Sequence, residues 1–149
     1  MIIREYNSKD IEEIAALFYD TVHEICSRDY TKGQLDAWAS MDMDRDAWDH
    51  SFLKHYTLVA VKDGMIAGFG DMDNTGYLDR LYVHKDYQGQ GVATALCDRL
   101  EAGFPDGTVT THASITARPF FESRGYRVLK EQQVERKGVI LTNYVMKKD

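Results

Sequence analysis

A glycine loop between a strand and a helix constrains this chain most. Gln88-Gly89-Gln90-Gly91 follows a segment with strand character, Tyr77 to His84, and precedes a segment with helical apolar spacing that begins at Val92. The N-terminus of a helix leaves backbone N–H groups unpaired and carries partial positive charge, so it can bind a phosphate group. Glycine has no Cβ atom and lets a ligand approach the backbone closely. The loop therefore predicts an anion-binding site at this junction.

Two well-known nucleotide motifs do not fit the loop, although a tight turn without any ligand would. A P-loop requires a Gly-Lys pair, which the sequence lacks. A dinucleotide fingerprint requires Gly or Ala where Thr94 stands, and an acidic residue about 20 positions further on, where Thr110-Thr111-His112 occurs. The loop also follows a predicted antiparallel meander rather than the first strand of a doubly wound sheet.

The chain reads as one mixed α/β domain over residues 1–149, because its length suits a single domain and no Gly/Ser-rich linker divides it. Thr31 and Gln34 form a capping box that predicts the start of a helix. A helix separates the strands at 77–84 and 108–113, so these two strands should run parallel. The other predicted strands are 2–6, 57–61, 65–71, 126–133 and 139–146, and the helices begin near 8, 31, 44, 92 and 116.

The composition excludes several function classes. Eighteen Lys and Arg against 24 Asp and Glu give a formal net charge of −6, which argues against nucleic-acid or membrane binding through a basic surface. Cys26 and Cys97 form no C-x-x-C motif, and no close Cys/His pair has the spacing of metal ligands, so we expect reduced core cysteines and no metal. The first residues lack a basic leader, and no apolar run suits a membrane span, so a cytoplasmic protein is expected.

Two motifs in the second half resemble those of the GCN5-related N-acetyltransferases. Gln88, Gly91 and Ala93 match the first, fourth and sixth positions of that family's Q-x-x-G-x-[GA] signature. The segment 117–126 (ARPFFESRGY) is similar to the family's A-x-x-F-Y-E-x-x-G-F segment, and 29–39 resembles a subgroup of uncharacterised bacterial members. The resemblance implies a mostly antiparallel sheet of about six or seven strands, splayed between the fourth and fifth and flanked by about four to five helices.

The resemblance also implies acetyl-CoA as the donor and a primary amine, preferably of a small molecule, as the acceptor. The amine would attack the thioester directly in a ternary complex, with the Val83 N–H polarising the carbonyl. The backbone of Leu81, Tyr82 and Val83 would pair with the pantetheine arm. The pyrophosphate would lie on Gln88, Gly89, Gln90, Gly91, Val92, Ala93 and Thr94, and the arm would be bordered by Ser114, Ala117 and Phe120.

Two positions depart from the family pattern. Ser114 stands where the family often has Asn, and Phe121 stands where it has the Tyr usually assigned as the acid for the leaving thiolate. A phenyl ring donates no proton. At neutral pH, release of a thiolate without a proton costs about 2 kcal/mol, whereas deprotonating an alkylammonium group costs about 4.6 kcal/mol. Supplying a base therefore matters more than supplying an acid, and Phe121 does not exclude catalysis.

Several residues are candidates for handling the proton. Asp79 lies just before the donor-binding segment on its strand and shares strand parity with Tyr77, Leu81 and Val83, so it is our first candidate. His112 and His84 end neighbouring strands and titrate in a suitable range. Each of the three also has an ordinary structural explanation. The residues that could replace the missing acid, or simply pack, are Tyr82, Tyr126 and Tyr144.

The first two helices are expected to shape the acceptor site. Tyr30, Trp38 and Tyr77 are the predicted substrate-binding residues, and Glu24 and Asp29 would make their surroundings acidic and favour a cationic amine. The alternative is that Trp38 packs in the core and Asp29 forms a turn. A non-catalytic acyl-CoA sensor and an acetyltransferase acting on protein N-termini or lysines also remain open, and a homodimer is compatible with the sequence.

Overall fold

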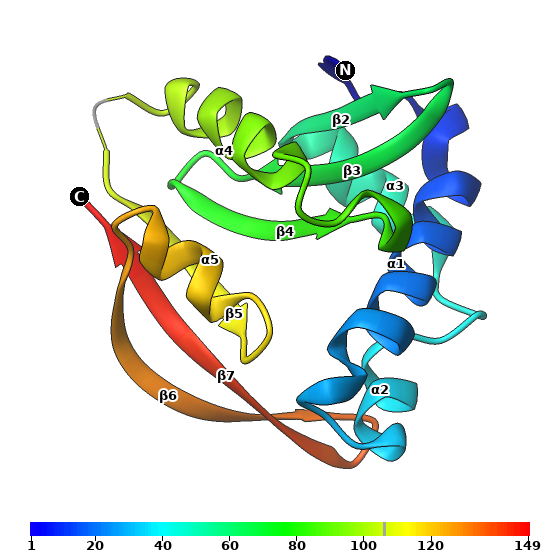
Figure 1. Ribbon diagram of the computed structural model, residues 1–149, viewed down its shortest axis with the longest axis vertical. Helices are drawn as coiled ribbons and strands as arrows, with labels where there is room; N and C mark the ends of the chain where they lie inside the picture. The colour runs from blue at the N-terminus through cyan, green and yellow to red at the C-terminus, as the bar shows by residue number, and fades with distance from the viewer. Residues whose placement is uncertain (106) are drawn as a thin grey trace.

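A seven-stranded sheet in the order β1-β2-β3-β4-β5-β7-β6 organises the molecule. The computed structural model describes residues 1–105 and 107–149 (Figure 1). The strands are β1 (Ile2–Glu5), β2 (Tyr56–Lys62), β3 (Met65–Met72), β4 (Tyr77–Val83), β5 (Val109–Ser114), β6 (Arg127–Arg136) and β7 (Val139–Lys148). The α-helices are α1 (Ile11–Ile25), α2 (Lys32–Trp38), α3 (Arg45–Lys54), α4 (Val92–Ala102) and α5 (Arg118–Ser123). The described residues also form three short 3-10 helices, η1 (Ser8–Asp10), η2 (Cys26–Arg28) and η3 (Lys85–Tyr87).

The predicted mixed α/β class is confirmed, including the parallel pairing of β4 with β5. The capping box at the start of α2 is present in both halves: the Gln34 N–H donates to Thr31 Oγ1, and the Thr31 N–H donates to Gln34 Oε1. These bonds satisfy backbone donors that the helix itself leaves open. Asp44 caps α3 in the same way by accepting from the Ala47 N–H.

Helices cover both faces of the sheet. On one face α4 packs Val92, Leu96 and Leu100 against buried residues of β2, β3 and β4. On the other face α1, α2 and α3 enclose a second core that contains Phe18, Phe52 and many other apolar side chains. Burial on this scale supplies the main driving force for folding. In Figure 1, α1 runs down one side of the molecule and carries the chain from β1 to α2.

The sheet divides between β4 and β5. Only Tyr77 with Thr110 and Leu78 with Thr111 form residue pairs between these parallel strands, although β4 continues to Val83 and β5 to Ser114. β5 then pairs along its whole length with β7. The predicted splay between the fourth and fifth strands is therefore confirmed.

The last two strands are longer than the sequence predicted, 127–136 and 139–148 rather than 126–133 and 139–146. Lys137 and Gly138 both have positive φ, 50° and 77°, which is the pattern of a tight two-residue hairpin turn. Polar residues dominate β6, and this obscured the strand signal near its end. Figure 1 shows this hairpin sweeping beneath the split toward α2, where Gln34 Nε2 donates to the Ile140 carbonyl.

Both cysteines are buried and free, as expected. Burial raises the pKa of Cys97 to about 12, so this thiol stays protonated at neutral pH. In the described residues, no helix is both long and apolar enough to cross a membrane.

Glu101 at the end of α4 ties three segments together. Its carboxylate accepts hydrogen bonds from Tyr126 Oη at 2.8 Å, Lys148 Nζ at 2.8 Å and the Arg124 guanidinium at 2.9 Å. Burial alone would raise the pKa of Glu101, but the hydrogen bonds from Arg124, Lys148 and Tyr126 outweigh it and hold the pKa below its usual range.

We predict that Glu101→Gln lowers the free energy of unfolding at neutral pH by about 2 kcal/mol, because two cations and a phenol lose their charged partner. A carboxylate with a lowered pKa stabilises the fold at pH values above its unfolded pKa, and this contribution is lost as the pH falls through the folded pKa. The difference between variant and wild type should therefore shrink in acid. Urea unfolding at several pH values measures it, with Glu122→Gln on the solvent face of α5 as a control that changes little.

Candidate active site

Two cavities meet where β4 and β5 part. The first, here called the loop cavity, has a volume of about 550 Å³ and lies between the glycine loop and the start of α5. The second, here called the inner cavity, has a volume of about 430 Å³ and lies on the α1–α3 side of the split. Both linings contain Leu81, Tyr82, Ser114, Ala117 and Phe121. The five shared residues come from β4, the end of β5 and α5, so the two spaces join across the split.

The glycine loop forms one end of the loop cavity. Gly89 and Gly91 have positive φ, 71° and 82°, a backbone conformation that side chains disfavour. Gly91 is the N-cap of α4 and offers no side chain, and a Cβ atom added at either glycine would meet no described atom within 4 Å. The backbone at both glycines is therefore open to the approach of a ligand. This cradle fits a diphosphate, the group that the sequence predicted here.

The side chains of the two loop glutamines have other partners. Gln88 Nε2 donates to the Val83 carbonyl at 2.8 Å and so holds the loop against the end of β4. Gln90 Oε1 accepts from Lys62 Nζ at 2.7 Å, and Gln90 is missing from the described cavity linings. Of the predicted donor-binding residues Gln90 alone falls outside both cavities, because the loop turns its side chain toward β2.

The end of β4 presents backbone groups to the split. The His84 N–H donates to the Ala67 carbonyl of β3 at 2.8 Å. Peptide groups alternate in direction along a strand, so the amides of Val83 and Leu81 point the other way, toward the side that β5 has left. Thr21 Oγ1 donates to the Val83 carbonyl at 2.8 Å, as does the Gln88 amide. The remaining donor on Val83 is its N–H.

The inner cavity combines aromatic rings with polar side chains. Its described lining includes the rings Phe18, Tyr30, Trp38, Trp48, Tyr77, Tyr82 and Phe121, and the polar residues Asp79, Arg80, Thr111, His112, Ser114, Arg136, Thr142 and Asn143. All three predicted substrate-binding residues, Tyr30, Trp38 and Tyr77, are among them. So are both predicted catalytic residues, Asp79 and His112.

A β-bulge changes the expected direction of Asp79. Arg80 pairs with Asp71 and Leu78 pairs with Met72, so Asp79 is an extra residue in β4. Leu78 and Leu81 pack on the α4 side, whereas Asp79, Arg80 and Tyr82 line the inner cavity. The prediction that Asp79 shares a face with Leu81 and Val83 was therefore wrong, because the bulge reverses the alternation. Its consequence is that a carboxylate and a guanidinium enter the same cavity from adjacent positions.

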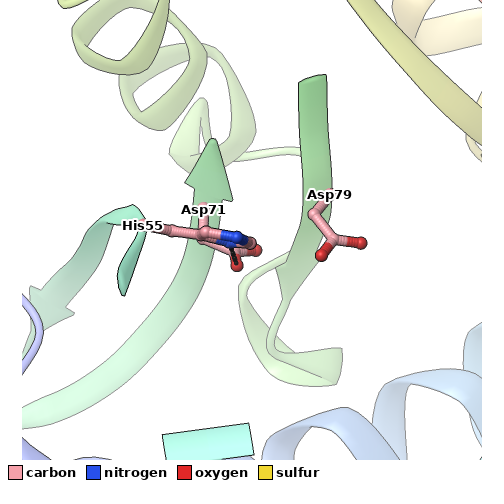
Figure 2. A group of neighbouring side chains, drawn as sticks. All are labelled: His55, Asp71 and Asp79. Atoms are coloured by element: carbon pink, nitrogen blue, oxygen red, sulfur yellow. Dashed lines mark hydrogen bonds and ion pairs between the residues drawn. The ribbon is translucent and has the colours of Figure 1, made fainter. Parts of the chain in front are cut away.

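A buried charge cluster lies behind Asp79. Asp71 has no exposed surface, and its Oδ2 accepts from Arg80 Nη1 at 2.5 Å and from His55 Nδ1 at 2.7 Å. Figure 2 shows His55 and Asp71 meeting beside Asp79 on the neighbouring strand. Burial raises the pKa of Asp71, while Arg80 and His55 act against that rise. Asp71 Oδ1 finds no hydrogen-bond partner among the described residues.

Ligand atoms of His55, Asp71 and Asp79 lie within 4.8 Å of one another, close enough to hold a metal ion. The chain supplies a cation of its own to this cluster, because Arg80 Nη1 is also 3.6 Å from Asp79 Oδ2. The Arg80 guanidinium is fixed further by Ser51 and by stacking 4.7 Å above the Trp48 ring. Three acidic or imidazole groups around an arginine do not fit a metal site well.

His112 and Tyr77 both line the inner cavity and contact each other edge to face, with the ring centroids 5.2 Å apart. Burial lowers the pKa of His112, and the nearby charge of Asp79 opposes this only in part. The imidazole is therefore neutral at pH 7 and able to accept a proton. Burial also raises the pKa of Tyr77 to about 12, so that phenol stays protonated.

Several candidates turn out to serve the fold instead. Within the described linings neither cavity contains His84, Glu24 or Asp29. His84 caps η3 by accepting from the Asp86 N–H, Glu24 pairs with Lys85, and Asp29 accepts from Thr116 Oγ1. The expected acidic surroundings of Tyr30 and Trp38 are therefore absent from this part of the described cavity.

Of the three tyrosines that could replace the missing acid, Tyr82 lines the described cavities, whereas Tyr126 and Tyr144 do not. Tyr126 Oη donates to Glu101, and the Arg118 guanidinium lies 4.5 Å from the centroid of the Tyr144 ring. Neither tyrosine belongs to the described cavity linings. Tyr82 lines both cavities and accepts from Trp38 Nε1 at 3.3 Å, and burial raises its pKa. Phe121 also lies at the junction. Tyr30 bridges the structure by donating to the Thr142 carbonyl and accepting from the Ile115 N–H.

Sequence reasoning missed Arg80, Asp71, Arg136 and Asn143. Arg80 could have been suspected from its place beside Asp79, but only the bulge puts both in one cavity. Arg136 and Asn143 reach the inner cavity through the β6–β7 hairpin, which no local motif predicts.

Comparison with known proteins agrees with the fold and the split sheet. A family model described as an acetyltransferase (GNAT) domain matches residues 26–148. The chain belongs to this family, the GCN5-related N-acetyltransferases, and is an N-acetyltransferase by fold and homology. It is 35% identical over 145 residues to the Escherichia coli K12 protein named uncharacterized N-acetyltransferase YafP, covering 97% of this chain and 93% of that one.

Solved structures give the same picture. A GCN5-related N-acetyltransferase from Rhodopseudomonas palustris superposes with a TM-score of 0.93 at 34% identity, over 99% of this chain and 94% of that one. The PaiA N-acetyltransferase of Thermoplasma acidophilum, solved with coenzyme A, has a TM-score of 0.77 at 14% identity, over 99% and 97% of the two chains. The Salmonella typhimurium YncA structure, which contains acetyl-CoA, has a TM-score of 0.71 at 20% identity, over 99% and 92%. The last two share the fold.

We predict that Asp71→Asn lowers the free energy of unfolding by about 3 kcal/mol, because it leaves the partly buried Arg80 without its charged partner. Chemical denaturation followed by circular dichroism measures this change. Asp36→Asn removes an exposed carboxylate paired with Lys32 and should leave stability unchanged. Equal stabilities of the wild type and Asp71→Asn would contradict an ionised Asp71.

Proposed function

We propose that this protein transfers an acetyl group from acetyl-CoA to the primary amine of a small molecule. The observation that supports this most is the junction of the two cavities at the split between β4 and β5. One cavity ends at an anion cradle suited to the donor, and the other is an aromatic space suited to an acceptor. A donor and an acceptor in these spaces would meet at Tyr82 and Phe121.

The donor would bind along the loop cavity. The amides of Gly89 to Val92 and the start of α4 would hold the pyrophosphate, and the backbone at Leu81 and Val83 would pair with the pantetheine arm as an added strand. Phe120 and Ala117 would border that arm from α5. Bound in this way, acetyl-CoA supplies an activated acetyl group as a thioester.

The Val83 N–H would stabilise the charge that develops on the thioester oxygen. Its direction toward the split follows from the pairing of His84 with β3. Loss of one such donor costs about 3 kcal/mol in other acyl-transfer enzymes. The chain provides no thiol for a covalent intermediate, because burial raises the pKa of both cysteines, so direct attack by the amine is the mechanism that we propose.

The acceptor amine must lose a proton before it attacks. Asp79 is partly exposed in the inner cavity and would bind the ammonium group electrostatically. His112, neutral at pH 7 and beside the same cavity, would receive the proton directly or through water. Tyr82, with its raised pKa and its place at the junction, is the phenol that would protonate the leaving thiolate.

A small acceptor fits better than a protein chain. The hairpin tip is bonded to α2 through Gln34 and Ile140, and it bounds the inner cavity opposite β4. A protein lysine or N-terminus would need an open groove along this side. An acyl-CoA sensor without catalysis is the second candidate, favoured by Phe121 in place of the expected phenol.

We predict that Gly91→Val weakens coenzyme A binding by about tenfold or more, because it strains a positive φ and places methyl groups in the anion cradle. Isothermal calorimetry with coenzyme A measures the effect. Gly138→Val is the matched control, since Gly138 also has positive φ and open space but lies in the β6–β7 turn. Unchanged affinity in a folded Gly91→Val protein would overturn the loop assignment.

We also predict that Asp79→Asn lowers kcat/KM for amine acceptors by about tenfold or more without changing coenzyme A affinity. Release of the free thiol from acetyl-CoA across a panel of amines measures turnover. Asp46→Asn, in the first turn of α3, removes an exposed carboxylate as a control. Binding of acetyl-CoA without turnover on any acceptor would favour the sensor instead.

A further inference from the structure

The inner cavity contains cationic groups that acetyl transfer to a simple amine does not require. Arg80 enters from β4 and Arg136 from the end of β6. Among the described lining residues Asp79 is the only carboxylate facing them. Because the buried Asp71 pairs with Arg80, the cavity presents charges of both signs, although the chain as a whole carries a formal net charge of −6.

The two arginines differ in how they are held. Asp71 and Ser51 hold the Arg80 guanidinium, which lies over the Trp48 ring and keeps 17% of its side-chain surface exposed. Arg136 is exposed and, like Asp79, lines the inner cavity together with Tyr77 and His112. Arg136 and Asp79 therefore lie near the same pair of rings. A ligand between them would meet one negative and one positive group.

This arrangement disfavours a polyamine, whose additional ammonium groups would lie beside the guanidinium groups. It favours an acceptor that carries an anion as well as an amine, because a guanidinium binds a carboxylate through paired, charge-assisted hydrogen bonds. The aromatic walls suit a flat apolar body between the two charged ends. A cavity of about 430 Å³ has room for a molecule of this size.

The lining of the inner cavity also contains an amide oxygen without a hydrogen-bond partner among the described residues. Asn143 lies on β7 opposite Ser114 of β5 and lines the inner cavity. Its Oδ1 is inaccessible to solvent and finds no hydrogen-bond donor among the described residues. An acceptor N–H is a suitable donor, and an unsatisfied buried acceptor is costly.

We infer that the acceptor is a primary amine bearing a carboxylate and an apolar, flat side group, as an aromatic amino acid does. Its ammonium group binds at Asp79 and Asn143, and its carboxylate binds at Arg136 and the exposed edge of Arg80. This inference names the acceptor class of the proposed acetyltransferase and so rests on that function.

Binding can be tested without turnover, because both tryptophans of the chain, Trp38 and Trp48, line the inner cavity. Their fluorescence is followed while coenzyme A-saturated protein is titrated with L-phenylalanine, 2-phenylethylamine or 3-phenylpropanoate. The first probe carries both charged groups, the second carries the amine alone, and the third carries the carboxylate alone. L-phenylalanine is expected to bind about tenfold more tightly than 2-phenylethylamine. Equal or tighter binding of 2-phenylethylamine would overturn the inference.

The substitution Arg136→Gln is the second part of the binding test. It should remove the preference for L-phenylalanine and leave 2-phenylethylamine binding unchanged, since only the carboxylate loses a partner. Arg127→Gln on the same strand is the matched control, because Arg127 pairs with Asp149 away from the described cavity linings. A preference that survives Arg136→Gln would refute the role given to Arg136.

The acetyl-transfer assay separates this inference from the proposed function. Acetylation of 2-phenylethylamine in preference to L-phenylalanine would keep the acetyltransferase and refute the acceptor class. Tight, Arg136-dependent binding of L-phenylalanine without any acetylation would support the acceptor site and refute the proposed catalysis.

Discussion

The early parting of β4 and β5 is the constraint on which the rest of the structure depends. It leaves backbone groups inside a sheet without strand partners, and such groups are costly when buried. Side chains take their place. Thr111 Oγ1 donates to the Leu78 carbonyl at the branch point, and Thr21 Oγ1 and Gln88 Nε2 donate to the Val83 carbonyl. On the β5–β7 side, Tyr30 Oη accepts from the Ile115 N–H and donates to the Thr142 carbonyl. The opening is thus stabilised before any ligand binds.

The bulge at Asp79 belongs to the same local event. Pairing between β4 and β5 ends at Leu78, and the extra residue follows directly. Bulges bend a strand and increase its twist, which turns the rest of β4 away from β5. The same insertion moves Arg80 to the face of the inner cavity and opposite the buried Asp71. One added residue therefore both opens the sheet and sets the charges beside the opening.

The sequence predicts those parts whose determinants lie close together in the chain. The capping box of Thr31 and Gln34 and the glycine loop before α4 each depend on a few neighbouring residues, so their patterns were sufficient. The family motifs then indicated the split sheet. The direction of Asp79 depends on pairing with β3, and the place of Asn143 depends on how β7 crosses β5. The regular alternation of side chains along one strand predicts neither position. The charge pattern of the inner cavity therefore became visible only in the structure.

The replacement of the expected phenol by Phe121 has a limited energetic consequence. Its ring is 3% exposed and packs against Phe120 and Tyr126 at centroid distances of 5.3 and 5.0 Å, so it forms an apolar wall at the junction of the cavities. An apolar wall excludes water from a thioester and strengthens nearby electrostatic interactions. Because deprotonating an ammonium group costs more than releasing a thiolate, an enzyme can lose a proton donor here more easily than the groups that bind and deprotonate the amine. Asp79 and His112 are among the polar groups that line the inner cavity, where the proposed acceptor would bind.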